Sequence, residues 1–213
     1  MHANECALAC ISADPQAARG PAQAVVDLSR QYGVSGCLGA GNFCLRWASY
    51  HGGDRAAGLA DMRDAMTICR EQEAIFMPNY VFLLAEAEAL SGEVEIAIAR
   101  VVDQLAEISH SGQLWLEAEL HRRHSELLLQ RAPPDEPAAE RAFTRALAAA
   151  RGQQATIFEL RAAVGLARLY QSQRRFGPAR DSLGPVRATW GENLDIPEVQ
   201  EGERVLRSLD SAN

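Results

Sequence analysis

Small and apolar residues recur in this chain with the spacing of one helix face, and this feature limits what the chain can fold into. Between residues 136 and 152 they fall at i, i+3, i+4, i+7, i+8 and i+11, namely Ala139, Ala142, Phe143, Ala146, Leu147 and Ala150. Such spacing predicts an α-helix with a single apolar stripe. Because most of the stripe is alanine, the backbone of a partner helix must approach it closely.

The helical pattern itself repeats about every 40 residues. The small residue of each second helix falls at Gly58, Ala97, Ala139 and Ala179, which are spaced 39, 42 and 40 residues apart. Four and seven residues after each of them the chain is apolar, except at Gln104. The first helices align at Arg46, Ala85, Ser125 and Ala167. This period predicts an all-α fold, an α-solenoid of antiparallel helical hairpins.

Composition agrees with closely packed helices and argues against some classes of partner. Of the 213 residues 47% are hydrophobic but only 6% are aromatic, which favours helices over β-sheet. A net charge of −7 argues against nucleic acid or an anionic membrane as a main partner. No run approaches the roughly 20 apolar residues of a membrane span.

Five cysteines without a C-x-x-C pair indicate a reduced, cytoplasmic chain and not a disulfide framework. Cys37 and Cys44 lie seven residues apart, so we expect both on one helix face as small buried side chains.

Within the chain we expect two parts. Residues 1–21 are expected to be irregular or frayed because Gly20-Pro21 interrupts the helical pattern, although Asp14-Pro15 could cap a helical turn. Residues 22–213 form the repeat domain, beginning with a helix from Ala22 to Tyr32 that has no partner helix before it. A capping helix at about 197–209 closes the domain, with Asp195 as its N-cap.

The repeating units resemble the tetratricopeptide repeat in pieces. Ala85, Gly92 and Ala97 match its pattern in one unit, Ala139, Phe143 and Ala146 in the next, and Ala167, Tyr170 and Ala179 in the last. The stretches ERAFTRALAAARGQQATIFELRAAVGLARLY and LGPVRATWGENLDIPEVQEGERVL are similar to the C-terminal repeat region of bacterial multidomain ATPases. Many of those also carry an adenylate/guanylate cyclase domain or a DNA-binding domain. The resemblance implies a right-handed superhelix and a role in signal transduction.

The family's chemistry lies in domains that the resemblance does not cover, and we find no catalytic motif here. A phosphate-binding G-x-x-x-x-G-K-[ST] loop is missing, and the chain has no lysine at all. We therefore expect no enzyme activity, no cofactor and no metal. One alternative is a small helical metal-dependent enzyme, because Glu117, His121 and His124 share a helix face. Packing of His124 beside Leu120 and Leu127 explains the same spacing. A truncated remnant without independent function is another alternative.

In tetratricopeptide arrays the first helices line the concave face, and the resemblance therefore implies a ligand-binding surface. Carried over residue by residue, that surface consists of Phe43, Trp47, Asn79, Phe82, Glu86, Glu119, Arg122, Glu126, Arg161 and Arg168. Its mixture of aromatic, acidic and basic side chains suits an extended peptide or protein segment, and an ATPase or cyclase domain is one candidate partner. We expect Phe82 to supply apolar contact and Arg122 or Arg168 to hold an acidic group. Alternatively, Glu86, Arg122 and Glu126 pair with one another.

Overall fold

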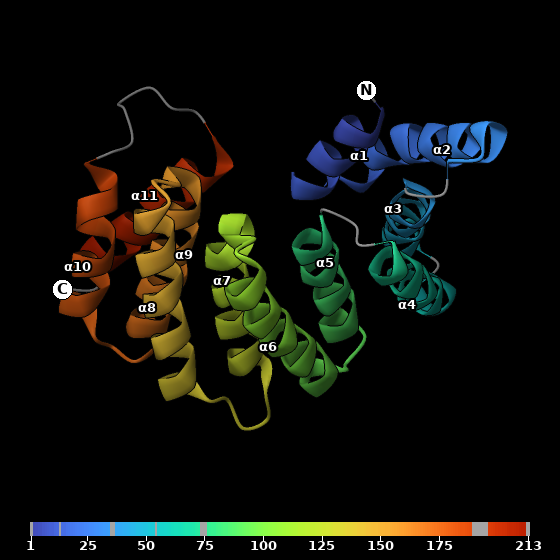
Figure 1. The fold of residues 1–213 in the computed structure, drawn as a ribbon. Coiled ribbons are helices and arrows are strands. Elements are labelled where there is room, and N and C mark those ends of the chain that lie inside the picture. The colour runs from blue at the N-terminus through green and yellow to red at the C-terminus, as the bar shows by residue number, and fades with distance from the viewer. Residues whose placement is uncertain are drawn as a thin grey trace. The chain divides into compact units, whose positions relative to one another are not determined.

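The described residues of the chain are helical throughout, as the sequence predicts (Figure 1). The computed structural model describes residues 2–12, 14–34, 37–53, 55–72, 76–188 and 196–211. Within these ranges there is no strand. The chain forms two compact units, Met1–Gln104 (unit 1) and Leu105–Asn213 (unit 2), where we expected one repeat domain over residues 22–213.

Unit 1 begins with two helices where an irregular segment was expected. Its elements are α1 (His2–Ile11), α2 (Pro15–Tyr32), α3 (Leu38–His51), α4 (Arg55–Glu71), α5 (Met77–Leu90) and the first part of α6 (Val94–Ser111).

The expectation for residues 1–21 is therefore wrong. Pro21 lies inside α2 and not at its start, and the buried side chains of Ala18 and Ala22 on either side hold that turn in the core. The Asp14 side chain accepts hydrogen bonds from the amides of Gln16 and Ala17, which caps α2 as predicted. Because α2 packs on both α1 and α3, it also has the partner that we expected it to lack.

The core of unit 1 is built from large side chains that surround α3. Phe43, Trp47 and Tyr50 are fully buried, and α3 contacts α1, α2, α4 and α5. Glycines permit this close packing. A Cβ at Gly58 of α4 would lie 2.9 Å from the Cα of Tyr50, so only glycine fits there without a shift of the backbone.

The described residues of unit 2 form the rest of α6, a short 3₁₀ helix (Leu114–Leu116) and five α-helices. These are α7 (Glu117–Gln130), α8 (Glu136–Gly152), α9 (Thr156–Ser172), α10 (Phe176–Arg187) and α11 (Pro197–Asp210). From α7 to α11 each helix packs on the next one, and α9 also contacts α7 and α11. The terminal helix begins at Pro197 as expected. Asp195 and Trp190 lie outside the described residues.

The aligned small residues of the second helices are all buried. Gly58, Ala97, Ala139 and Ala179 lie in the interior, and so do the residues four and seven positions later, including Gln104. The register of the first helices is right for Ala85, Ser125 and Ala167, which are also buried. It is wrong for Arg46, whose side chain is half exposed and pairs with Asp61 at 3.3 Å.

Candidate functional site

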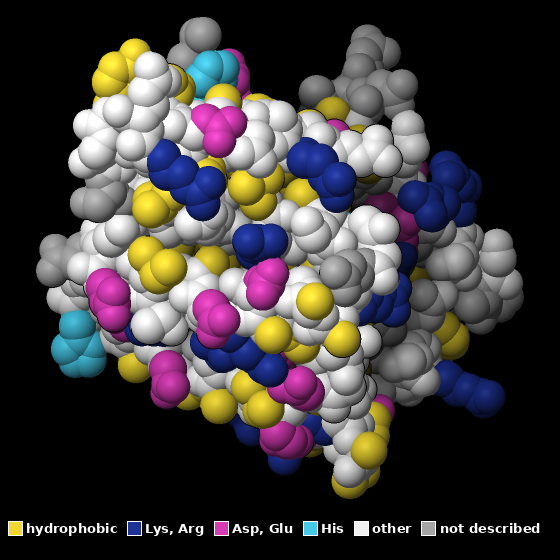
Figure 2. Space-filling model, turned by 90° about the vertical axis from the view of Figure 1, so that its right-hand side faces the viewer, with side chains coloured by type: hydrophobic (Ala, Val, Ile, Leu, Met, Phe, Trp, Pro, Cys, Tyr) yellow, Lys and Arg dark blue, Asp and Glu magenta, His cyan; other side chains and the backbone are white. Residues whose placement is uncertain are grey.

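The candidate residues of unit 1 do not form an open binding face. Phe43, Trp47 and Asn79 are buried, which contradicts the expectation that they contact a ligand. Phe43 and Trp47 lie on α3, which packs against α1, α2, α4 and α5, and Asn79 lies on α5, which contacts α1, α3 and α4. The ring centroids of Phe43 and Tyr80 are 4.9 Å apart and their planes are tilted by 44°. Phe82 and Glu86 are half-buried on one face of α5. Figure 2 shows a face of the molecule on which acidic, basic and apolar side chains are interspersed.

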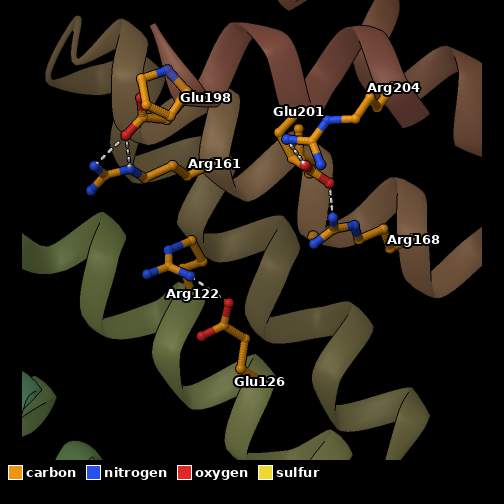
Figure 3. A pocket seen from close by; sticks show the side chains of 10 residues that line it. Arg122, Glu126, Arg161, Arg168, Glu198, Glu201 and Arg204 are labelled. Carbon is orange, nitrogen blue, oxygen red and sulfur yellow. Dashed lines mark hydrogen bonds and ion pairs between the residues drawn. The ribbon is translucent and has the colours of Figure 1, made fainter. Parts of the chain in front are cut away.

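The candidate residues of unit 2 come together around one pocket (Figure 3). The pocket has a volume of about 340 Å³ and lies among α7, α9 and α11. Four predicted residues line it: Arg122 and Glu126 from α7, and Arg161 and Arg168 from α9. The fifth, Glu119, is buried beside it and bonds to two of these arginines.

Local helix geometry explains why these side chains converge. Arg122 and Glu126 are four residues apart on α7, and Arg161 and Arg168 are seven residues apart on α9, so each pair lies on one helix face. Between the α9 arginines, Gly165 lines the pocket, and its missing side chain lets α9 pack closely on α8. A Cβ there would overlap the ring of Phe143, so no other residue fits without a shift of that ring.

Sequence reasoning missed the residues that α11 contributes. Glu198, Glu201 and Arg204 follow one another at intervals of three on the face of α11 that lines the pocket. The spacing indicates one polar face, but it does not reveal that α11 packs on α9. That packing adds two carboxylates and a fourth arginine to the pocket.

The charged side chains at one end of the pocket form a continuous chain of ion pairs. Glu119 accepts two hydrogen bonds from Arg122, at 2.9 and 3.1 Å, and one from Arg161 at 3.2 Å. Arg161 also donates to Glu198 at 2.6 and 3.1 Å. Glu126 pairs with both Arg122 and Arg123. The pairing of Arg122 with Glu126, which we weighed as the alternative to ligand binding, is therefore present.

At the other end of the pocket, positive side chains outnumber negative ones. Arg168 and Arg204 both pair with Glu201, so two guanidinium groups share one carboxylate. Their side chains are also the most exposed of the pocket arginines, at 57% and 62%. A shared carboxylate leaves a surplus of positive charge and of N–H donors at this end, where an incoming acidic group can be bound.

The structure does not bring Glu117, His121 and His124 together as a group of possible metal ligands. Among the described residues, the cluster of three or more possible metal ligands consists of cysteines and does not include Glu117, His121 or His124. Burial lowers the pKa of His121 to about 4, and the nearby charge of Arg145 contributes to this shift. A neighbouring cation that disfavours imidazolium also disfavours a metal cation.

Comparison with protein-family models and with curated proteins gives no match. Among the residues that the structure describes, none of the helices combines the length and the apolar character that a membrane crossing requires.

Proposed function

We propose that this protein is a non-catalytic helical-repeat module that binds a protein or peptide segment in the unit 2 pocket. The bound segment carries an acidic group, held between Arg168 and Arg204. The observation that carries this proposal is the single carboxylate of Glu201 shared by these two exposed arginines. An acidic side chain or a C-terminal carboxylate would give each guanidinium its own partner.

The finer description of the fold belongs to the same proposal. In unit 2 the helices pack on their sequence neighbours, and the alternate helices α7, α9 and α11 contact in turn. Stacked helical hairpins give this contact pattern, and a tetratricopeptide-type superhelix is one arrangement of such hairpins. Of the five residues of α7 and α9 that the resemblance places on the concave face, four line the pocket, and Glu119 is buried beside it.

The resemblance also suggests what the module does in the cell. If it acts as the regulatory arm of a signalling ATPase or cyclase, its ligand is an acidic segment of that enzyme domain, met in the cytoplasm. The mixed charges of the pocket suit such a protein segment better than a polyanion, because Glu126, Glu198 and Glu201 would repel repeated phosphates.

The test starts from peptides selected for binding to the purified protein from a random displayed library. We expect selected sequences to be enriched in Asp and Glu. Fluorescence anisotropy with one selected peptide then compares Arg168→Glu with Arg187→Glu. Both arginines are more than half exposed and both pair with a glutamate of α11, Glu201 and Glu203, but Arg187 does not line the pocket.

Arg168→Glu should weaken binding at least about tenfold, which corresponds to about 1.4 kcal/mol. Arg187→Glu should leave it within about twofold. Glu201→Gln should tighten binding, because it removes the carboxylate that competes with the ligand for both arginines. Equal loss in the two charge reversals, or selected peptides without acidic residues, would contradict the proposal.

A further inference from the structure

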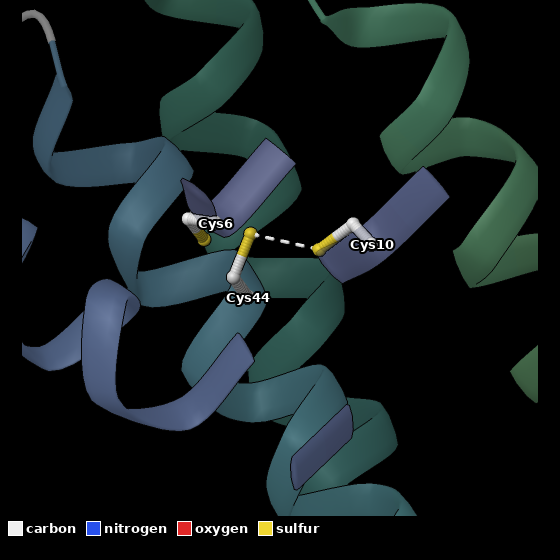
Figure 4. Close-up of side chains that lie close together, drawn as sticks. All are labelled: Cys6, Cys10 and Cys44. Atoms are coloured by element: carbon white, nitrogen blue, oxygen red, sulfur yellow. Dashed lines mark hydrogen bonds between the residues drawn. The ribbon is translucent and has the colours of Figure 1, made fainter. Parts of the chain in front are cut away.

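Three buried cysteines of unit 1 bring their sulfur atoms together (Figure 4). Cys6 and Cys10 lie one turn apart on α1, and Cys44 lies on α3. The three sulfur atoms are all within 4.8 Å of one another, and those of Cys10 and Cys44 are 3.2 Å apart. Cys10 and Cys44 are 34 positions apart in the sequence, yet α1 and α3 bring three thiol groups, which are soft metal ligands, close together.

The other two cysteines show that this convergence is not general. Cys69 is fully buried in the same apolar core but does not belong to the cluster, so it behaves as a small packing residue. Cys37 is exposed, contrary to our expectation that it shares a buried face with Cys44. It precedes the first residue of α3, where its side chain is not held in the core.

The size and number of the ligands point to an ion with three sulfur neighbours. Three sulfur atoms about 2.3 Å from a common ion lie about 4 Å apart when the ion is in their plane, as Cu⁺ is, and closer together when the ion sits above that plane, as pyramidal trivalent arsenic does. The observed spacings, 3.2 Å for Cys10–Cys44 and at most 4.8 Å for the other two pairs, lie on either side of this value. Zn²⁺ in structural sites almost always takes four ligands. Soft ions that accept three thiolates fit this site better.

We propose that Cys6, Cys10 and Cys44 bind one thiophilic ion of three-coordinate preference, of the class to which trivalent arsenic and Cu⁺ belong. With arsenous acid the exchange balances without an oxidant: three As–O bonds are replaced by three As–S bonds, and three water molecules leave. The product is neutral, which suits an apolar core. With Cu⁺ the three thiols release three protons to the solvent and the complex carries two negative charges; if one thiol keeps its proton, two protons are released and the complex carries one negative charge. Binding ties α1 to α3.

The probes are arsenite and Cu⁺, each added to the full-length protein with a phosphine reductant present. Equilibrium dialysis with elemental analysis measures how many ions each chain binds and how tightly. We expect one ion per chain, and at least about tenfold weaker binding in Cys6→Ala, Cys10→Ala and Cys44→Ala. The matched controls Cys69→Ala and Cys37→Ala should bind as the wild type does. Tighter binding of arsenite than of Cu⁺ would show that the site selects for a neutral complex. Tighter binding of Cu⁺ would show that it selects for a soft ion.

X-ray absorption on the loaded wild-type protein counts the sulfur neighbours directly and does not depend on whether a variant folds. Three sulfur neighbours support the proposal, whereas two or fewer overturn it. Equal binding by the wild type and by well-folded variants of the three cluster cysteines also overturns it. The proposal is also overturned if the three cysteines bind Zn²⁺ and neither arsenite nor Cu⁺ in excess displaces it.

Discussion

Units 1 and 2 each contain a chain of ion pairs with a buried carboxylate at its centre. In unit 1 the order is Glu93–Arg63–Glu88–Arg100, and the Glu88 side chain is completely buried. In unit 2 the order is Glu126–Arg122–Glu119–Arg161–Glu198, and the Glu119 side chain is 4% exposed. Both carboxylates are surrounded by two guanidinium groups, as a buried charge requires.

The surroundings of these two networks differ. In unit 2 the arginines and the outer carboxylates line a pocket of about 340 Å³, and two further arginines share Glu201 next to it. The unit 1 residues do not line that pocket, and their network joins α4, α5 and the start of α6. A charged network alone therefore does not mark a binding site. Exposed donors and an opening beside the network make the difference.

The largest effect should come from removing the cations around each buried carboxylate. Arg63→Met/Arg100→Met leaves Glu88 buried without a partner and should lower the free energy of unfolding by about 3–5 kcal/mol. Arg122→Met/Arg161→Met should destabilise unit 2 comparably, because it removes both partners of Glu119. Urea unfolding monitored by circular dichroism measures both.

Ligand binding then separates the two networks. Under conditions where both double variants remain folded, peptide affinity should fall only in the unit 2 variant. A loss of affinity in the folded Arg63→Met/Arg100→Met variant would remove the distinction between the units. A cost below about 1 kcal/mol in either variant would show that its carboxylate is not desolvated.

A second difference is that the stability of unit 2 should depend on pH through the half-buried His121. Burial lowers the folded-state pKa of His121 to about 4, from an ordinary value of 6.5, and Arg145 adds to the shift. The unfolded chain therefore binds a proton that the folded protein does not, so stability falls as pH drops from about 6.5 to about 4 and then levels off. Allowing for partial exposure of the ring, we expect about 1–2 kcal/mol.

Carboxylates titrate in the same range, so the measurement must be a difference between variants. Urea unfolding of the wild type and of His121→Gln should be compared at several pH values between about 7.5 and about 4. The wild type should lose more stability than the variant over this range. Parallel curves would mean that the ring takes up a proton equally well in the folded state.

The fold could be predicted from the sequence where burial is local and periodic. The stripe through Ala139, Phe143 and Ala146 determines the inner face of α8 without knowledge of its partners. Prediction failed in the N-terminal segment because the rule that proline ends a helix was outweighed by tertiary packing around Pro21. The burial of Ala18 and Ala22 depends on α1 and α3, which the local pattern does not describe.

The residues of the candidate site likewise include some that could be predicted from the sequence and some that could not. Arg122, Glu126, Arg161 and Arg168 could be found because their positions follow from the faces of α7 and α9. The α11 residues could not, because their place depends on the packing of that helix on α9. The thiol cluster was missed because Cys10 and Cys44 are brought together by two helices, of which α1 was not expected to form.

The smallest expected effect tests the register of α3, the first helix in which the repeat alignment fails. The repeat alignment places Arg46 with the buried Ala85, Ser125 and Ala167, yet its side chain is 48% exposed and its partner Asp61 is 44% exposed. An exposed ion pair of this kind contributes little, so Arg46→Ala should change the free energy of unfolding by less than about 1 kcal/mol.

The neighbouring residue supplies the control for that measurement. Trp47 is buried in the core of unit 1, so Trp47→Ala should cost about 3–5 kcal/mol. Because successive residues of a helix face directions about 100° apart, the two substitutions report which face of α3 is turned inward. If Arg46→Ala lowered the free energy of unfolding strongly and Trp47→Ala lowered it little, Arg46 would face inward, as the repeat alignment places it. The opposite result, which we expect, confirms that α3 departs from it.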